Sequence, residues 1–383
     1  MPTTALVFSS AYAAALSSLP VHSNRDCMTF SLLQHTGLLA HVHVIAPDVA
    51  SPSDLKRFHS SDYVDALKAE TSSAAAIMLE HGLVDDAYAF PGLFSYCSYV
   101  AGASLTASKL LVSGSIDIAI NWGGGRHHAK KDHASGFCYV NDVVLAVDYL
   151  LHNIHACKVL VIDIDVHHGD GVEEAFYFSS QVFTLSFHKF ARGFFPGTGS
   201  PSSIGRGAGR HRNLNVPLDD GITDNQFFEV FEVVVQAIVE AFMPTHVVMT
   251  CGVDTLATDP LGTFNLTATG LCWCLDVVKE LELPLLLLGG GGYNESDAAR
   301  CFAALTATAI DQMLPDQVSD HDYFPMYGPH FGMATAPVKA RVNKNTVASL
   351  EATCQQALKQ IGRLRRREDA VNSGGVASIV PTA

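Results

Sequence analysis

Residue types that bind divalent metals recur at every second position in one apolar stretch of the chain. Residues 158–171 begin with a run of aliphatic side chains, and Asp163, Asp165 and His167 follow it. Alternate side chains of an extended backbone share one face, so these three point the same way. Carboxylate oxygen and neutral imidazole are ligand types that a catalytic divalent metal such as zinc takes. The stretch is therefore predicted to supply half of a metal site.

Polar side chains that could do chemistry also follow three other apolar segments. They are His127 and His128 after residues 116–120, Asp254 after residues 245–250, and Tyr293 after residues 284–288. In an open parallel sheet the site lies outside the carboxyl ends of the strands, so all of these groups are expected at one edge. Asp165, His167 and Asp254 would then supply three metal ligands and leave a position open for water and substrate, as a catalytic zinc needs.

The remaining polar residues at this edge suit acid–base chemistry. His127 and His128 are expected beside the reactive water as general base and acid. Asp163 and Asp170 are the carboxylates that could orient the two imidazoles. Tyr293, which follows four glycines, is placed to donate a hydrogen bond to a developing oxyanion. Taken alone, the two histidines fit a ligand, a base or a structural role about equally well.

Structural roles are the simplest alternative for these residues. A single Asp after a strand is more often a helix cap than a metal ligand. However, burying three carboxylate or imidazole groups on one strand face without a counter-ion would be costly, which favours a metal site for Asp163, Asp165 and His167. The pair Lys130 and Lys131 is expected in a solvated turn.

The elements that must position these residues are predicted to form an α/β domain. Buried strands are expected at residues 116–120, 159–164, 182–187, 245–250 and 284–288, and helices at 141–151, 224–242 and 343–367. Helical patterns separate most of the strands, which predicts a single, mostly parallel central sheet covered by helices on both faces. One catalytic domain would span residues 1–367, and residues 368–383 are expected to form a loose tail.

Composition narrows the compartment and the partners. The chain of 383 residues is 48% hydrophobic, enough for a large core, and its net charge of −14 argues against direct nucleic-acid binding while suiting a basic polypeptide substrate. Nine cysteines without a Cys-x-x-Cys pair indicate a reducing compartment. No signal-like N-terminus and no membrane-length apolar run are present, so a soluble intracellular protein without membrane contact is expected.

Four segments carry a family resemblance. They are residues 124–142 with Arg-His-His, 163–176 with Asp-Ile-Asp-Val-His-His, 186–199 with Phe-Phe-Pro-Gly-Thr-Gly, and 289–294 with four glycines before Tyr-Asn. Together they resemble the class I zinc-dependent histone deacetylases of the arginase/deacetylase fold, closest to the type-eight branch. The resemblance implies a hydrolase that removes acetyl groups from N-acetyl-lysine side chains of histones or other proteins, in the nucleus or the cytoplasm.

By motif position, the resemblance also assigns roles to individual residues. Zinc would be held by Asp165, His167 and Asp254. His128, backed by Asp170, would be the general base and then the acid; His127, backed by Asp163, would be its electrostatic partner; and Tyr293 would polarise the acetyl carbonyl. The substrate-binding positions are Asp86, Gly136, Phe137, Phe195 and Leu261. A structural potassium ion would use Asp163, Asp165, His167, Ser186 and Phe187, largely through backbone oxygens.

Several positions depart from the family pattern. Arg126 stands where the family has a large apolar residue, and Arg25 is expected to face the same cavity, where the leaving acetate would lie. Pro260 and Ser296 occupy positions at which corepressor-dependent members carry arginines for an inositol phosphate. Activity without a corepressor is therefore expected. The loop around Asp86 also differs from the family's usual sequence.

Other functions fit parts of the pattern. An acetylpolyamine deacetylase or a two-metal ureohydrolase would be a related hydrolase, and the ureohydrolase needs extra carboxylates near Asp259. An acetyl-lysine-binding scaffold without turnover belongs to another class, and the full set of catalytic residue types argues against it. One imidazole and two carboxylates suit iron(II) as well as zinc, so the ligand types leave the metal open.

Overall fold

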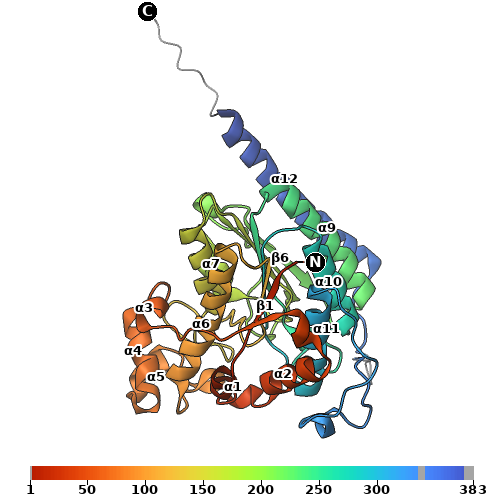
Figure 1. Ribbon diagram of the computed structural model, residues 1–383. Helices are drawn as coiled ribbons and strands as arrows, with labels where there is room; N and C mark the ends of the chain where they lie inside the picture. Colours follow the sequence, from red (N-terminus) through yellow and green to blue (C-terminus); the bar gives the residue numbers. More distant parts are fainter. Residues whose placement is uncertain (1, 335–340, 375–383) are drawn as a thin grey trace, which may run out of the picture.

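An eight-stranded, entirely parallel sheet forms the centre of the computed structural model, which describes residues 2–334 and 341–374 (Figure 1). In chain order the strands are β1 (Thr4–Val7), β2 (His43–Ile45), β3 (Ile118–Asn121), β4 (Val159–Asp163), β5 (Val182–Lys189), β6 (Asn213–Leu218), β7 (His246–Thr250) and β8 (Leu285–Leu288). Their order across the sheet is β2-β1-β3-β8-β7-β4-β5-β6, and every pair of neighbours is parallel. This confirms the predicted α/β class.

Helices cover both faces of the sheet. The α-helices are α1 (Ser10–Leu16), α2 (Arg25–His35), α3 (Pro52–Leu55), α4 (Ser61–Ala69), α5 (Ala75–Glu80), α6 (Leu93–Val112), α7 (Asp142–Asn153), α8 (Asp170–Phe176), α9 (Asp224–Phe242), α10 (Ala268–Lys279), α11 (Glu295–Ala309) and α12 (Val347–Gly374). Short 3₁₀ turns are η1 (Pro20–His22), η2 (Leu38–His41), η3 (Glu70–Ser72), η4 (Asp85–Ala87), η5 (Gly207–Gly209), η6 (Val253–Thr255) and η7 (Phe324–Tyr327).

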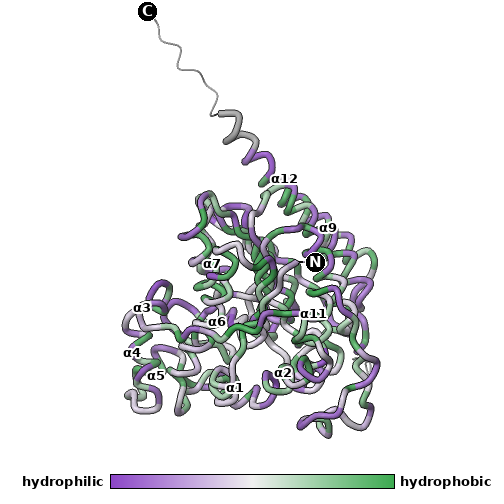
Figure 2. Tube along the Cα trace, in the orientation of Figure 1, coloured by the Kyte–Doolittle hydropathy of each residue, from purple (hydrophilic) through white to green (hydrophobic). Residues whose placement is uncertain are grey.

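Alternation along the strands divides the apolar core into two halves. Val159 and Val161 of β4 pack into one buried cluster, with residues of α1, α4, α6 and α7. Leu160 and Ile162 pack into the other, with residues of α2, α9, α10, α11 and α12. Because a strand buried on both faces must be apolar at every position, β4 reads as one aliphatic run, and Figure 2 shows hydrophobic segments gathered at the sheet.

The predicted strands and helices are present, with shifts of one or two residues at most of their ends. The helix predicted at residues 224–242 is α9, and Asn141 caps α7 by accepting a hydrogen bond from the Val144 amide at 3.0 Å. The four-residue strand β1 was not predicted, and neither were β2 and β6: β2 has three residues and is largely exposed, and β6 contains Pro217. β2 and β6 lie at the edges of the sheet, where a proline or a short, exposed strand is tolerated.

The C-terminal helix is longer than expected. It was predicted to end near Arg367, and α12 ends at Gly374, so part of the predicted tail is helical. The rest of that tail, residues 375–383, lies outside the described residues. All nine cysteines are free thiols. Within the described part of the chain, each helix is too short or too polar to span a bilayer.

Candidate active site

The four strands that precede the predicted site residues are consecutive neighbours in the sheet. Their order is β3-β8-β7-β4, so their carboxyl ends form one continuous edge at the middle of the sheet. The loops that leave these ends carry the two histidines, Tyr293, Asp254, and the pair Asp165 and His167. Topology alone therefore brings the chemically active side chains together.

Asp165, His167 and Asp254 form a buried cluster suited to a metal ion. His167 Nδ1 lies 3.1 Å from Asp165 Oδ1 and 3.0 Å from Asp254 Oδ2. The three potential ligand atoms all lie within 4.8 Å of one another, and all three residues are buried. One imidazole and two carboxylates arranged around a common point are a ligand set for a catalytic divalent metal with a free coordination position.

Backbone amides and glycines hold the two carboxylates of this cluster. The Gly291 amide donates to Asp165 Oδ2 at 2.8 Å, and the Val166 amide donates to Asp254 Oδ1 at 2.9 Å. A Cβ atom at Gly291 would collide with the carboxylate of Asp254, and one at Gly252 would collide with that of Asp165. The absence of side chains at these glycines leaves the space that the ligand cluster needs.

The electrostatics of the cluster also favour a cation. Burial, together with the negative charge of Asp165, raises the pKa of Asp254 to about 8. Burial disfavours a charged His167, but its contacts with Asp165 and Asp254 outweigh burial and raise its pKa to about 10. The carboxylates of Asp165 and Asp254, with oxygen atoms within 4.8 Å of each other, repel each other in a buried site. A divalent cation would relieve that repulsion.

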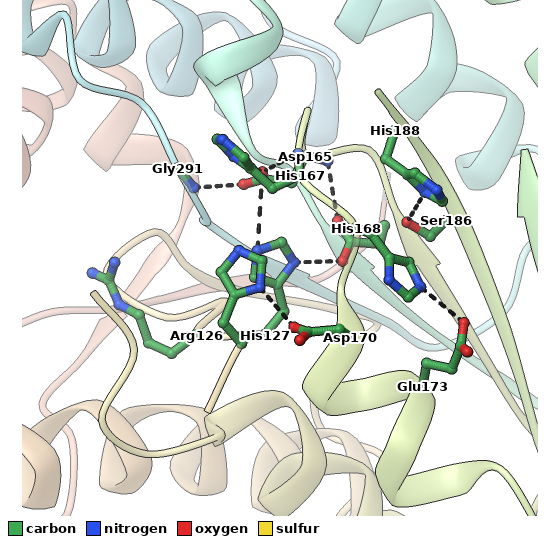
Figure 3. A network of polar contacts seen from close by, with 12 residues as sticks. Arg126, His127, Asp165, His167, His168, Asp170, Glu173, Ser186, His188 and Gly291 are labelled. Carbon is green, nitrogen blue, oxygen red and sulfur yellow. Dashed lines mark hydrogen bonds and ion pairs between the residues drawn. The ribbon is translucent and has the colours of Figure 1, made fainter. Parts of the chain in front are cut away.

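Each histidine of the pair after β3 has its own carboxylate; of these four residues, Figure 3 labels His127 and Asp170. His127 Nδ1 lies 2.6 Å from Asp163 Oδ2, and His128 Nδ1 lies 2.8 Å from Asp170 Oδ1. The two imidazole rings are 3.9 Å apart. The other carboxylate oxygen of Asp170 lies 2.7 Å from Lys130 Nζ. Because Nδ1 of each histidine is hydrogen-bonded to a carboxylate, Nε2 is the ring nitrogen available for proton transfer.

The two histidines differ in the protonation state they favour. Burial opposes charge on His127, but Asp163 and Asp165 outweigh burial and raise its pKa to about 9. For His128, burial and the nearby His127 together lower the pKa to about 3. The pair is thus polarised into one positively charged and one neutral imidazole. Only the neutral imidazole can accept a proton.

Tyr293 lies across the same hollow from the histidines. Residues that line this hollow include His128, His167, Phe137, Arg126 and Tyr293. The Tyr293 ring lies 5.7 Å from that of Phe137, and its amide donates to Asp259 Oδ2 at 2.7 Å. Burial, with the charges of Asp254 and Asp165, raises the pKa of Tyr293 well above its usual value. The phenol therefore stays protonated and can donate a hydrogen bond.

Aromatic side chains and a glycine line the way into the hollow. A Cβ atom at Gly136 would come within 2.6 Å of His128 and 2.8 Å of Phe195, so a side chain there would fill the space between them. Gly136 and Phe137 both have positive φ angles, 54° and 60°, which place Phe137 in a conformation uncommon for a residue with a side chain. Phe195 is 38% exposed and Leu261 is 43% exposed, so both reach the surface.

Asp86 lies beside the loop that carries Gly136, and the residues assigned to potassium lie on β4, β5 and the turn after β4. Asp86 lies on η4, exposed, and its Oδ2 accepts a hydrogen bond from the Gly136 amide at 3.1 Å. Ser186 of β5 is the register partner of Asp163 in β4, and the Ser186 Oγ lies 2.8 Å from His188 Nδ1. Phe187 follows Ser186 and is fully buried. The five positions assigned to potassium thus come from β4, β5 and the turn after β4.

Three supporting residues were not predicted as part of the site. Asp142 accepts hydrogen bonds from the amides of Gly125 and Arg126, at 3.0 and 2.7 Å, and so fixes the loop before the histidines. Asp259 accepts from Leu261 as well as Tyr293. The expectation of a solvated turn was wrong for Lys130, whose side chain is only 12% exposed because it pairs with Asp170. Only long-range contacts reveal these roles, since the local sequence gives no signal for them.

The geometry also bears on the alternative with two metals. Among the described residues, Asp165, His167 and Asp254 form the one group of three such side chains close enough to hold an ion. Asp259, the carboxylate considered for a second metal, is engaged with backbone amides of Tyr293, Leu261 and Gly262. Its role in the structure is to brace the loops around the site.

The comparisons with known proteins all point to one family. The histone deacetylase domain family matches residues 19–309. Histone deacetylase 8 of Danio rerio is 43% identical over 348 residues, covering 90% of this chain and 91% of that protein. Histone deacetylase 8 of Xenopus tropicalis is 43% identical, with 88% and 92% covered, and histone deacetylase 19 of Arabidopsis thaliana is 43% identical, with 90% and 69% covered.

Proposed function

The chain belongs to the histone deacetylase family and is a lysine deacetylase, and we propose that it cleaves the acetyl-lysine amide with water at a metal site made by Asp165, His167 and Asp254. We propose zinc as the metal, although the ligand types also suit iron(II). The substrates would be acetylated histone tails or other acetylated proteins, in the nucleus or the cytoplasm.

One observation carries this proposal. The hollow that contains ligand residues Asp165 and His167 is also lined by His128, Tyr293 and Phe137. A base, an oxyanion donor and an aromatic wall therefore face one space beside the predicted metal. That combination suits hydrolysis of an amide presented on a narrow side chain, and a binding module has no need of the base.

Each residue has a chemical task in this scheme. When bound, a divalent metal would polarise the acyl oxygen and lower the pKa of a water molecule. His128, neutral and held through Nδ1 by Asp170, would accept a proton from the attacking water at Nε2. His127 would remain positively charged beside Asp163 and stabilise negative charge that develops nearby. Tyr293 would donate a hydrogen bond from its phenol to the tetrahedral oxyanion.

Collapse of the tetrahedral intermediate requires a proton for the leaving amine. His128 would return the proton that it accepted to the lysine nitrogen, so that the amide C–N bond breaks and the amine leaves neutral. Phe137, Phe195 and Gly136 would enclose the aliphatic lysine chain and keep bulk water away, with Leu261 at the mouth. Asp86, exposed beside this entrance, would accept hydrogen bonds from the substrate backbone.

Two further features belong to the proposal. A potassium ion would be held by Asp163, Asp165, His167, Ser186 and Phe187, mainly through backbone oxygens. It would stiffen the turn that carries the metal ligands. Because Pro260 and Ser296 replace arginines that would bind an inositol phosphate, we also propose that the chain acts without a corepressor.

Substitution of the base tests the mechanism. His128→Ala is expected to reduce release of acetate from an acetyl-lysine peptide by at least about 1,000-fold, because the catalytic groups act as a unit. His133→Ala is the matched control. The His133 side chain is 44% exposed, and its Nδ1 lies 2.9 Å from the carboxylate of the neighbouring Asp132. Turnover by the control should stay within about twofold of wild type, as for most surface changes. Unchanged turnover in His128→Ala would exclude His128 as the base.

A further inference from the structure

A group of buried polar residues lies behind the candidate active site. Its members interact electrostatically or through direct contacts, and each has a side-chain nitrogen or oxygen without a hydrogen-bond partner. They are His22, Arg25, Asp26, Tyr96 and Arg126, and we call this group the arginine pocket. All five are at most 7% exposed.

The two arginines have donors to spare. Arg25 donates from Nη1 to the Gly290 carbonyl at 2.9 Å, but its Nε and Nη2 have no hydrogen-bond partner. Arg126 donates from Nη2 to the Gly123 carbonyl at 3.1 Å, and its Nε has none. A buried donor without a partner destabilises the fold, and the penalty is greater for a charged group. These donors therefore leave the pocket able to bind a ligand with hydrogen-bond acceptors.

Charge selects the class of that ligand. Both guanidinium groups stay positively charged in a protein. Asp26 is the nearby carboxylate, but its Oδ1 lies 3.9 Å from Arg25 Nη2, too far for a hydrogen bond. Asp142, also close to Arg126, already accepts from Ser104 and from the amides of Gly125 and Arg126. The free donors therefore suit a planar anion such as a carboxylate.

The position of Arg126 connects this pocket to the reacting acyl group. Arg126 lines the same hollow as Asp165, His167 and Tyr293, and it is 3% exposed. Phe137, at the outer side of the hollow, is only half-buried. A lysine side chain that enters past Phe137 brings its acyl carbon to the metal ligands. Arg126 lines this hollow, so the far end of a longer acyl group could reach it; in Figure 3 its side chain points away from the His127 and Asp165 cluster.

Building on the proposed deacetylase function, we propose a second activity: removal of lysine acyl groups that end in a carboxylate, such as malonyl or succinyl, with Arg126 binding that carboxylate. Arg25 adds positive charge to the same pocket. In this reaction the amide C–N bond breaks, water supplies a hydroxyl to the acyl carbon and a hydrogen to the lysine nitrogen, and a dicarboxylate is released. The chemistry needs no co-reactant beyond water.

Matched acyl groups provide the test. Peptides carrying malonyl- or succinyl-lysine are compared with their neutral isosteres, 3-methylbutanoyl- and 4-methylpentanoyl-lysine, and each kcat/KM is divided by that for the acetyl peptide. Wild type should cleave at least one carboxylate-bearing peptide faster than its isostere. In Arg126→Met that preference should fall by about tenfold or more, as expected for loss of a charge-assisted hydrogen bond. Arg126→Lys keeps the positive charge but lacks the planar guanidinium. In this variant the preference for the carboxylate-bearing peptide should fall less.

The remaining outcomes separate this proposal from the deacetylase function. If wild type cleaves the acetyl peptide but prefers both neutral isosteres, or if Arg126→Met keeps the wild-type preference, the second activity is overturned and the deacetylase function stands. If wild type cleaves no peptide, both fail. Inhibition by free acetate is measured in parallel. Relief of that inhibition in Arg126→Met with an unchanged acyl preference would show that the pocket takes a released acid, which also overturns the proposal.

Discussion

Two buried polar regions meet at the hollow, and they differ in how completely their hydrogen bonds are made. In the segment of residues 163–170, from the end of β4 to the start of α8, both carboxylate oxygens of Asp163, Asp165 and Asp170 have partners. In the arginine pocket, each of the five residues has at least one atom without a partner. Both regions are almost inaccessible to solvent. Burial alone therefore does not explain the difference.

The difference indicates what each region does. A fully bonded cluster holds its side chains in one arrangement, which a metal site and its bases require. A cluster with spare donors keeps hydrogen-bonding capacity for a group that arrives with the substrate. We therefore expect substitutions in residues 163–170 to damage catalysis strongly, and substitutions in the arginine pocket to alter selectivity more than stability.

Loss of a metal ligand should have the largest effect. Asp254→Asn keeps the shape of the side chain but removes one of two negative charges that face His167. Deacetylation is expected to fall by at least about 1,000-fold, with loss of bound metal. Metal content after gel filtration and kcat/KM on an acetyl-lysine peptide measure the two effects. A variant that retains wild-type turnover would remove Asp254 from the ligand set.

Substitutions of the carboxylates behind the histidines should be milder. Asp163→Asn and Asp170→Asn each weaken the bond that orients one imidazole, at 2.6 and 2.8 Å. Each is expected to lower kcat/KM by about 10- to 100-fold, as for other residues that orient catalytic groups. Because Asp170 supports the base and Asp163 supports its charged neighbour, the pH profile should change more in Asp170→Asn. Equal profiles in both variants would contradict the separate roles of the two histidines.

The contrast in hydrogen bonding can also be measured as stability. Asp142→Ala would leave the Gly125 and Arg126 amides and the Ser104 hydroxyl without their acceptor, and should cost about 3 kcal/mol of unfolding free energy. Arg126→Met removes one hydrogen bond, from Nη2 to the Gly123 carbonyl, and an Nε–H group that has no partner, so it should cost about 1 kcal/mol, less than Asp142→Ala. Urea denaturation of both variants makes the comparison. A loss in Arg126→Met as large as that in Asp142→Ala would show that the guanidinium contributes more to the fold than its one hydrogen bond to Gly123.

The smallest expected effect is a pH dependence of stability near the site. Burial would raise the pKa of Glu173, but its bonds to His168 and Asn215, each 2.8 Å, outweigh burial and lower it. A lowered pKa means that the folded state prefers the carboxylate. The resulting stability is present above the unfolded pKa of about 4.5 and is lost as pH falls through the folded value. Unfolding free energy should therefore decline less between about pH 5 and 3 in Glu173→Gln than in wild type; parallel curves would contradict this.

The sequence predicted the central architecture because its signals there are local. β4 and β8 are mostly aliphatic, β7 is apolar from Val247 to Met249, and α9 has an apolar face together with a capping box at Thr223. β6 was missed because its sequence includes two asparagines and a proline. Its backbone bonds to β5, which no local pattern encodes, make it a strand.

The same division applies to the candidate site. Asp165 and His167 could be recognised because alternation in an extended stretch puts them on one face. Asp254 could be added because parallel topology brings strand ends together. Asp142 lies in the helix predicted at residues 141–151, and its contacts with the Gly125 and Arg126 amides depend on how α7 packs beneath the histidine loop. The unpartnered donors of Arg126 depend on packing around the whole pocket, which the sequence pattern does not report.

The central claim is that this chain hydrolyses acetyl-lysine with a metal held by Asp165, His167 and Asp254. The most direct measurement follows acetate release from an acetyl-lysine peptide by zinc-loaded protein, by the same protein after chelation, and after zinc is returned. We expect one acetate per lysine produced, loss of turnover on chelation, and recovery with zinc in wild type but not in Asp254→Asn. Turnover that persists after complete metal removal, or peptide binding without any hydrolysis, would contradict the claim.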